Sequence, residues 1–287
     1  MDPRAEDSGG SLIESETELA LDGSTLATTP PRSATFVLPN TLTLIVPVFN
    51  EAESFPQLIR DVERYVAPPF RLLLVYDADR DTTASLAREF AKSRPWLELV
   101  RNERVGLAHA LRTGFTRART GPVVVVAADG ADDLHNLSEM RRLYTDGNHL
   151  VAASRYSPGG AQLGGPPLRR WLSRWASWTL RKLAAIPVSD ATNSFRLYDA
   201  GIVNEVGIES RHGCTVALEL TAKFAARGEP MAAVPTTRTV SRHAPKRLGL
   251  LKRMRFSWEW FLFALQHRRK PGRQQTSKTE DHRSTRV

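Results

Sequence analysis

The chain has 287 residues. Apolar residues make up 41% of it, enough for a sizeable core, and charged residues make up 25%, as is ordinary for a globular protein. A single cysteine excludes an intrachain disulfide framework and suits a reducing compartment. The 40 Lys and Arg outnumber the 31 Asp and Glu, giving a net charge of +9; this favours an anionic partner, although a solvated basic surface also explains it. Runs of about 18 apolar residues and a basic-then-apolar leader are both missing, so we expect a cytoplasmic protein, with peripheral association at the inner face of a membrane as an option.

Four regions can be distinguished by composition. Residues 1–40 and 270–287 are polar and contain few large apolar side chains, so we predict disordered tails, because such segments bury too little surface to offset the entropy of ordering. Residues 41–240 are predicted to form one α/β domain, and residues 241–269 a basic amphipathic segment.

Short apolar runs alternate with amphipathic segments in the first half of the predicted domain. The runs carry β-branched residues and are apolar on both faces, as is typical of buried parallel strands: 42–48, 71–76, 97–100, 122–128 and 150–153. Helical periodicity separates them at 54–66, 82–93, 107–119 and 136–145. The alternation predicts a mainly parallel sheet with helices on both faces. Further along the chain we predict helices at 168–185, 215–227 and 248–267 and a strand at 231–237.

Ligands on sheets of this kind bind at the carboxyl ends of the strands, so the residues that follow each predicted strand are the candidates for a site. Asn50 and Glu51 follow the first strand and precede a helix whose free N–H groups can meet an anion; a plain helix cap is the alternative. Arg155 follows the fifth strand, where a guanidinium suits bidentate binding of phosphate, or simply lies at the surface.

Acidic residues cluster after the second strand. Asp81 or Thr82 is expected to cap the next helix, which leaves Asp77 and Asp79 to explain. Their carboxylates can accept hydrogen bonds from a base N–H and from ribose hydroxyls. The alternative is a solvated acidic turn.

A second acidic cluster follows the fourth strand. Asp129 ends a fully apolar run, and Asp132 and Asp133 come shortly after it. Mg²⁺ and Mn²⁺ take oxygen ligands, commonly one or two carboxylates together with substrate phosphates. We therefore predict a divalent-metal site with Asp129 and Asp132 as ligands, while one residue of the pair 132 and 133 caps the next helix.

Seven segments of the chain match, in order, the motifs of one enzyme family. They are PVFNE (47–51), YDADRDT (76–82), GLAHALRTGF (106–115), AADGADD (127–133), ASRYSPGG (153–160), SDATNSFRLY (189–198) and the Arg-rich stretch after Pro235. The chain thereby resembles the family 2 glycosyltransferases, and within them the dolichol-phosphate mannose synthase branch, from residue 41 to residue 260. The resemblance implies the GT-A fold, a Rossmann-like sheet that binds a nucleoside diphosphate sugar with a divalent metal, and inversion at the anomeric carbon.

The resemblance also implies roles for individual residues. Asp129 is expected to bind the metal, and Asp77 to approach the base of the nucleotide. Residues expected to border the nucleotide are Pro47, Phe49, Glu51, Asp77 and Asp79. Those expected to face the phosphates or the acceptor are Arg155, Arg242, Asp190 and Arg196. A polyprenyl phosphate acceptor is already an anionic nucleophile, whereas an alcohol acceptor needs a base, for which Asp190 is the candidate.

The chain departs from the family pattern at the metal motif. Ala127 stands where the usual Asp-x-Asp motif has its first carboxylate. This departure favours the main alternative to catalysis, a non-catalytic nucleotide-sugar-binding protein. A nucleic-acid binder is not expected, because the sequence contains no recognisable nucleic-acid module. A dinucleotide oxidoreductase is excluded because no Gly-x-Gly-x-x-Gly follows the first strand.

Two basic aromatic helices favour a lipid acceptor. Trp171, Trp175 and Trp178 recur at helical spacing among arginines of the predicted helix 168–185, and the predicted helix 248–267 is similar. Such helices suit an anionic membrane surface, so we expect a polyprenyl phosphate acceptor there. If the Trp stripe packs as core instead, a soluble acceptor fits better. The sequence does not indicate the sugar, the base or the oligomeric state.

Overall fold

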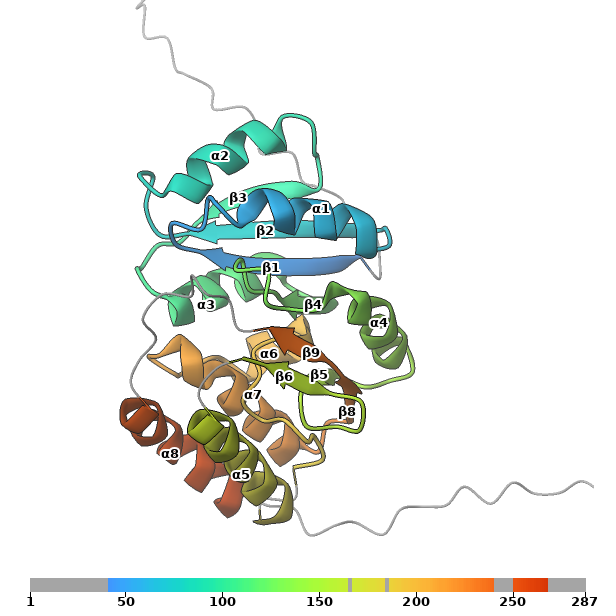
Figure 1. Cartoon of the computed structure of the whole chain (residues 1–287), viewed down its shortest axis with the longest axis vertical. Helices are drawn as coiled ribbons and strands as arrows, with labels where there is room; N and C mark the ends of the chain where they lie inside the picture. The colour runs from blue at the N-terminus through green and yellow to red at the C-terminus, as the bar shows by residue number, and fades with distance from the viewer. Residues whose placement is uncertain (1–40, 165–166, 184–185, 240–249, 268–287) are drawn as a thin grey trace, which may run out of the picture. The chain divides into compact units, whose positions relative to one another are not determined.

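The computed structural model describes residues 41–164, 167–183, 186–239 and 250–267. They form a seven-stranded sheet in the order β3-β2-β1-β4-β7-β5-β8 and a two-stranded sheet of β6 and β9 (Figure 1). The predicted α/β class, with a mainly parallel sheet, is confirmed. The predicted tails at 1–40 and 270–287 and the predicted phosphate ligand Arg242 lie outside the described residues.

The first half of the domain consists of βαβ units. Its elements are β1 (Leu42–Val48), α1 (Phe55–Tyr65), β2 (Phe70–Tyr76), α2 (Thr82–Ala91), β3 (Leu97–Arg101), α3 (Leu107–Ala118) and β4 (Pro122–Val125). All four strands are parallel to their neighbours in this half. The predicted fourth strand is too long, because β4 ends at Val125 and the apolar residues that follow leave the ladder.

The second half is less regular. Its elements are η1 (Leu134–Asn136), α4 (Leu137–Thr145), β5 (Leu150–Ser154), β6 (Ala161–Leu163), α5 (Pro167–Leu183), β7 (Arg196–Asp199), α6 (Ala200–Val206), α7 (Gly213–Arg227), β8 (Met231–Pro235), β9 (Thr237–Thr239) and α8 (Leu250–Gln266). The sequence pattern missed β7, which runs antiparallel between β4 and β5. Its four residues show no periodicity, and pairing on both sides makes them a strand.

Side chains of the central strands alternate between two cores. Leu44 and Val46 of β1 face the core formed with α1, α2 and α4, whereas Ile45 faces the core formed with α3, α6, α7 and α8. Burial of each such side chain contributes about 1.5–3 kcal/mol. Gly114 lets α3 lie close on the sheet, since a Cβ there would come within 2.7 Å of Ile45 Cγ2.

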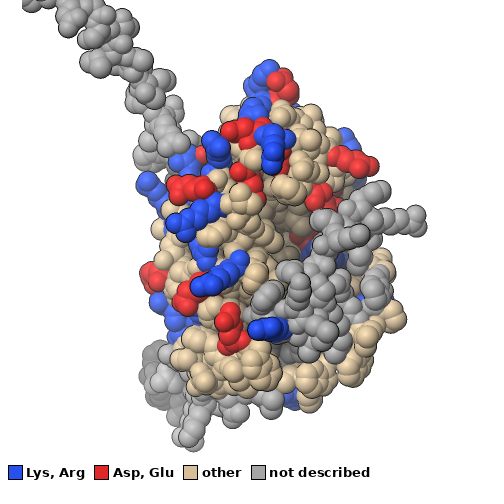
Figure 2. Space-filling view, turned by 90° about the vertical axis from the view of Figure 1, so that its left-hand side faces the viewer, with Lys and Arg blue, Asp and Glu red and all other residues tan. Residues whose placement is uncertain are grey.

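Helices α5 and α8 lie side by side at the end of the domain away from α2, and α8 also packs on α7 (Figure 1). Along α5, Trp171, Trp175 and Trp178 are 61%, 52% and 57% exposed, so the predicted Trp stripe does not pack as core. Within the described ranges, every helix is too short or too polar to cross a membrane. Figure 2 shows charges of both signs mixed over one face, without a continuous basic patch on its described part.

Candidate active site

The carboxyl ends of the parallel strands gather at one edge of the sheet. Strands β1 to β4 run in one direction, and β5 and β8 run the same way across the antiparallel β7. The segments that follow these strands therefore meet at this edge, together with the segment that precedes β7. The predicted site residues of the described part lie in or beside these segments, as expected for a doubly wound sheet.

Side-chain bonds join the segments after β1 and β2. The buried carboxylate of Asp81 accepts hydrogen bonds from the Asn50 amide at 3.0 Å and from the Thr83 and Ala84 amides, so Asp81 caps α2, one of the two predicted caps. The Glu51 amide donates to Thr83 Oγ1 at 2.7 Å. This bracing holds the loop after β1 in place and leaves Phe49 67% exposed at the edge. Pro47 lies within β1, one residue before its end at Val48.

The two predicted base-binding carboxylates have different surroundings. Asp77 accepts hydrogen bonds from Asn102 Nδ2 at 2.7 Å and from the Gly106 amide at 3.0 Å, so it holds the loop between β3 and α3. Gly106 has φ of 119°, which favours glycine at this position. Asp79 is 59% exposed and lies 3.6 Å from Arg88 and 3.4 Å from Arg101.

Replacement of Asp77 by alanine is expected to weaken nucleotide binding by about 1–3 kcal/mol, because the predicted hydrogen bond to the base is lost and the Gly106 loop is loosened. Calorimetric titration with nucleoside diphosphates measures the effect. Asp61→Ala on α1 is the control, since Asp61 accepts a hydrogen bond from Gln57 at the surface, away from this edge, and its replacement should leave affinity unchanged. Wild-type affinity in the Asp77 variant would contradict the prediction.

The acidic residues after β4 do not act as one cluster. Asp129 is partly buried and accepts a hydrogen bond from the Ala131 amide at 3.1 Å. The carboxylate of Asp132 is 2% exposed, accepts from the Ala127 amide at 2.8 Å and pairs with Arg238 at 2.7 Å. Asp133 caps η1 through the His135 amide, so it is the cap expected from the pair 132 and 133. The ion pair with Arg238 thus competes with the predicted role of Asp132 as a metal ligand.

Arg155 and Asp190 form a nearly dry ion pair. Arg155 Nε lies 2.7 Å from Asp190 Oδ2, its Nη2 lies 3.0 Å from Oδ1, and the two side chains are 11% and 0% exposed. Burial alone would raise the pKa of Asp190, but the hydrogen bonds and charge of Arg155 hold it below its usual range. A buried carboxylate with a lowered pKa is a poor general base, so this geometry argues against the predicted base role of Asp190.

Arg196, predicted to line the acceptor side, is fully buried. Its guanidinium donates to the carbonyl oxygens of Asp190, Asn193 and Ala217 and to Thr221 Oγ1. With its donors bonded inside the protein, Arg196 has no surface to present to an acceptor. We correct its role to fixing the segment before β7 onto α7.

Arg238 is a central residue of the site that sequence reasoning missed. Its Nη1 lies 2.7 Å from Asp132 Oδ1 and 3.1 Å from Asn193 Oδ1, and the residue is 8% exposed. It therefore joins the loop after β4 to the segment before β7. The Arg-rich stretch after Pro235 was the available signal, but nothing in it distinguishes Arg238 from its neighbours.

A basic cavity of about 340 Å³ lies beside the Arg155–Asp190 pair. Its lining includes Arg155 and Tyr156 after β5 and Arg170, Trp171 and Arg174 on α5. The cavity thus connects the carboxyl edge of the sheet to the helix with the exposed Trp stripe. The exposed Arg170 and Arg174 suit an anionic oxygen group, whereas the guanidinium of Arg155 is bonded to Asp190, Gln162 and Thr192.

A sheet of this topology with its site at the carboxyl edge is the architecture of GT-A glycosyltransferases, and solved structures of that class match. Glucosyl-3-phosphoglycerate synthase from Mycobacterium tuberculosis, in complex with Mn²⁺, UDP and glucosyl-3-phosphoglycerate, is 16% identical, with 80% of each chain covered and a TM-score of 0.55. A mannosyltransferase from Pyrobaculum calidifontis in complex with GDP-Man and Mn²⁺ is 21% identical, with 73% of this chain and 58% of that chain covered and a TM-score of 0.53. At these identities the likeness shows the fold alone.

The sequence profile of glycosyl transferase family 2 matches residues 43–207, more than half of the chain, and the chain belongs to this family. The polyprenol monophosphomannose synthase of Mycolicibacterium smegmatis is 31% identical over 204 residues, which cover 68% of this chain and 76% of the relative. The undecaprenyl-phosphate mannosyltransferase of Micrococcus luteus is 29% identical, over 67% of this chain and 81% of the relative. The predicted membership of the dolichol-phosphate mannose synthase branch is confirmed, and the chain is a glycosyltransferase.

Proposed function

We propose that the chain transfers a sugar from a nucleoside diphosphate sugar to a polyprenyl phosphate, with inversion at the anomeric carbon, at an anionic membrane surface on the cytoplasmic side. The observation that carries the proposal is the basic cavity between Arg155 and α5. It offers guanidinium groups to a phosphate and opens beside the exposed Trp stripe, where a lipid chain can leave toward a membrane. The named activities of the two relatives support the same acceptor class.

The paired state of Asp190 fits this acceptor. A polyprenyl phosphate attacks through an oxygen that is already ionised, so the reaction requires no protein base. Arg155 then has two tasks. It neutralises the buried Asp190, and it lines the cavity that receives the acceptor phosphate.

A divalent cation fits the site only together with the donor. Among the described residues, no three His, Cys, Asp or Glu side chains are grouped so that they could hold a metal ion. Asp129 remains as the protein ligand, and one carboxylate plus two phosphate oxygens is a common arrangement for Mg²⁺ or Mn²⁺. Such a cation, when bound, offsets the charge of the leaving diphosphate. We therefore infer that Mn²⁺ binds weakly to the protein alone and tightly in the presence of a nucleoside diphosphate.

The proposal is tested by a transfer assay with radiolabelled nucleotide sugars, Mn²⁺ and short-chain polyprenyl phosphate in vesicles. We expect labelled lipid with at least one common donor, such as GDP-mannose or UDP-glucose. Transfer to added sugars or sugar acids, but not to polyprenyl phosphate, would favour a soluble acceptor. Tight nucleotide-sugar binding without transfer or hydrolysis would favour the non-catalytic alternative.

Replacement of Arg170 and Arg174 by glutamate is expected to weaken binding to anionic vesicles by at least about 2 kcal/mol, since each basic residue near anionic lipid contributes on the order of 1 kcal/mol. Both side chains are exposed on α5 beside the Trp stripe. Co-sedimentation with phosphatidylglycerol vesicles at low salt measures the effect, and added salt should weaken wild-type binding. Arg60→Glu with Arg64→Glu on α1 is a control of equal charge. Equal loss of binding in both double variants would contradict a specific role for α5.

A further inference from the structure

Asn102, directly after β3, is a buried polar residue that the sequence pattern did not single out. It is 4% exposed, and its backbone amide donates to the Tyr76 carbonyl at 2.8 Å, so it is fixed to the end of β2. Its Nδ2 donates to Asp77 Oδ1 at 2.7 Å. The Asn102 side chain thus holds the carboxylate that is predicted to approach the base of the nucleotide.

The side chain of Asn102 is in turn held from α3. Thr113 Oγ1 donates to Asn102 Oδ1 at 2.9 Å, which leaves the Nδ2 end of the amide for Asp77. The reversed amide would place Oδ1 against the carboxylate, and two acceptors would then face each other without a hydrogen between them. Thr113 and Asp77 therefore favour the same orientation of this amide, and the three side chains form one chain of hydrogen bonds from α3 to the end of β2.

Asp77 is fixed at both of its oxygens. Oδ1 accepts from Asn102, and Oδ2 accepts from the Gly106 amide at 3.0 Å. Each carboxylate oxygen can accept a second hydrogen bond, so both oxygens can still bind N–H groups of a ligand. The two internal bonds set the plane of the carboxylate and with it the direction of the remaining acceptor positions. Because a hydrogen bond weakens steeply away from linear geometry, this orientation controls the affinity for a base.

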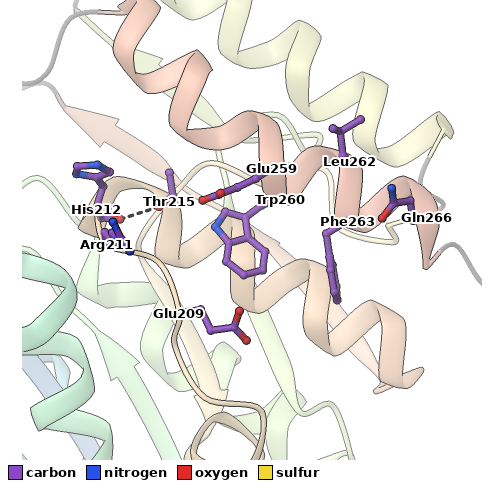
Figure 3. A pocket seen from close by; sticks show the side chains of 9 residues that line it. All are labelled: Glu209, Arg211, His212, Thr215, Glu259, Trp260, Leu262, Phe263 and Gln266. Atoms are coloured by element: carbon purple, nitrogen blue, oxygen red, sulfur yellow. Dashed lines mark hydrogen bonds between the residues drawn. The ribbon is translucent and has the colours of Figure 1, made fainter.

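Helix α3 is anchored next to Thr113. Arg112 donates to the carbonyl oxygens of Ile208 and Ser210 at 2.6 and 2.8 Å. Figure 3 shows that the loop with these carbonyls leads into α7, which packs on α8. Helix α3 is thereby tied to the helices beneath the sheet and cannot shift to close the gap that a lost Thr113 hydroxyl would leave. The effect of such a loss falls on Asn102 and, through it, on Asp77.

We propose that Thr113 and Asn102 are positioning residues for the nucleotide: Thr113 holds the amide of Asn102, and Asn102 holds the carboxylate of Asp77. This inference rests on the proposed nucleoside diphosphate sugar donor and on the predicted contact of Asp77 with the base. In such a donor, the ribose and the diphosphate separate the base from the anomeric carbon. A change at Thr113 should therefore weaken donor binding and raise KM, while kcat at saturating donor stays the same.

The test compares Thr113→Val, which keeps the branched shape and lacks the hydroxyl, with Thr113→Ser, which keeps the hydroxyl. Calorimetric titration with GDP and UDP in the presence of Mn²⁺ measures the Kd. For the diphosphate that the wild type binds more tightly, we expect the Kd of Thr113→Val to rise about fivefold, the effect of one neutral hydrogen bond, and that of Thr113→Ser to stay within about twofold. In the transfer assay, the KM for the donor should rise by the same factor with kcat unchanged.

Thr145→Val on α4 is the matched control, because Thr145 is exposed and donates to the Arg141 carbonyl at 3.0 Å. Its Kd should equal that of the wild type. Circular dichroism checks the fold of each variant. Thr113→Ala, which also lacks the hydroxyl, takes the place of Thr113→Val if the valine variant does not fold.

A double-mutant cycle separates positioning from a general structural role. If Thr113 acts through Asp77, Thr113→Val should raise the Kd by less than about twofold once Asp77 is replaced by alanine. Equal loss of affinity in both backgrounds, or a wild-type Kd in Thr113→Val while Asp77→Ala binds more weakly, would overturn the positioning role and leave the proposed function intact. A wild-type Kd in Asp77→Ala would overturn the base contact and this inference with it. A wild type that binds neither diphosphate would overturn the proposed function as well.

Discussion

Replacement of Asp190 by asparagine should lower the free energy of unfolding by about 3–5 kcal/mol at pH 7, because it leaves a buried guanidinium without its counter-charge. Asp190 is fully buried, and its carboxylate accepts two hydrogen bonds from the Arg155 guanidinium and others from Thr192 and Asn193. Asparagine keeps the size of the side chain, so the loss comes from charge and not from a cavity. Urea unfolding followed by circular dichroism measures it, with Asp146→Asn at the exposed end of α4 as the control, expected within about 0.5 kcal/mol of wild type.

The difference in free energy of unfolding between wild type and Asp190→Asn depends on pH, because the pKa of Asp190 is lowered in the folded protein. The folded protein holds the carboxylate ionised below its ordinary pKa of 3.8, so the unfolded chain takes up the proton first as pH falls. The stability from the ion pair is therefore fully present above the ordinary pKa and is lost as pH falls through the lowered value. We expect the free energies of unfolding of wild type and Asp190→Asn to differ by a constant amount from pH 7 to about pH 5, and by less below about pH 4. Equal free energies of unfolding of the two proteins already near pH 6 would contradict the lowered pKa of Asp190.

The sequence predicted those parts of the fold that depend on local pattern. The alternation of apolar runs and amphipathic segments gave β1 to β5 and the helices between them, because burial on both faces leaves a continuous apolar signal. Short elements such as β7 and α6 were missed, since a few residues carry no periodicity and depend on their neighbours in space.

The same limit applies to the site. The strand-end rule located the edge of the sheet at which the predicted site residues gather. The pairs 81/82 and 132/133 were predicted to supply caps because capping is a local interaction, and the structure selects Asp81 and Asp133. The partners of Asp132 and Asp190 could not be found in this way. Arg238 is 106 residues from Asp132, and Arg155 is 35 residues from Asp190. Motif resemblance located these acids near the site but could not tell which of them neutralise arginines.

The pairing of Asp132 with Arg238 changes what the altered metal motif means. With Ala127 in place of the first carboxylate and Asp132 engaged by an arginine, the edge around β4 has a smaller negative charge than three acids would give. A cation is then attracted chiefly by the donor diphosphate. This charge balance supports the proposal that Mn²⁺ binds weakly to the protein alone and tightly once a nucleoside diphosphate is present.

The largest effect on activity is expected for Asp129→Asn. Asp129 lies in the loop after β4 and is the carboxylate that we propose as the metal ligand, and a bound cation contributes several kcal/mol to stabilisation of the leaving diphosphate. We expect kcat/KM for sugar transfer to fall on the order of 10²–10³-fold, with the Mn²⁺ requirement shifted to higher concentration. Initial rates over a Mn²⁺ titration measure both quantities, and circular dichroism checks that the fold is intact. Asp133→Asn is the matched control, because asparagine also caps η1 and activity should stay within about twofold of wild type. Full activity in Asp129→Asn, or transfer by the wild type that EDTA leaves unchanged, would contradict the assignment of Asp129 to the metal.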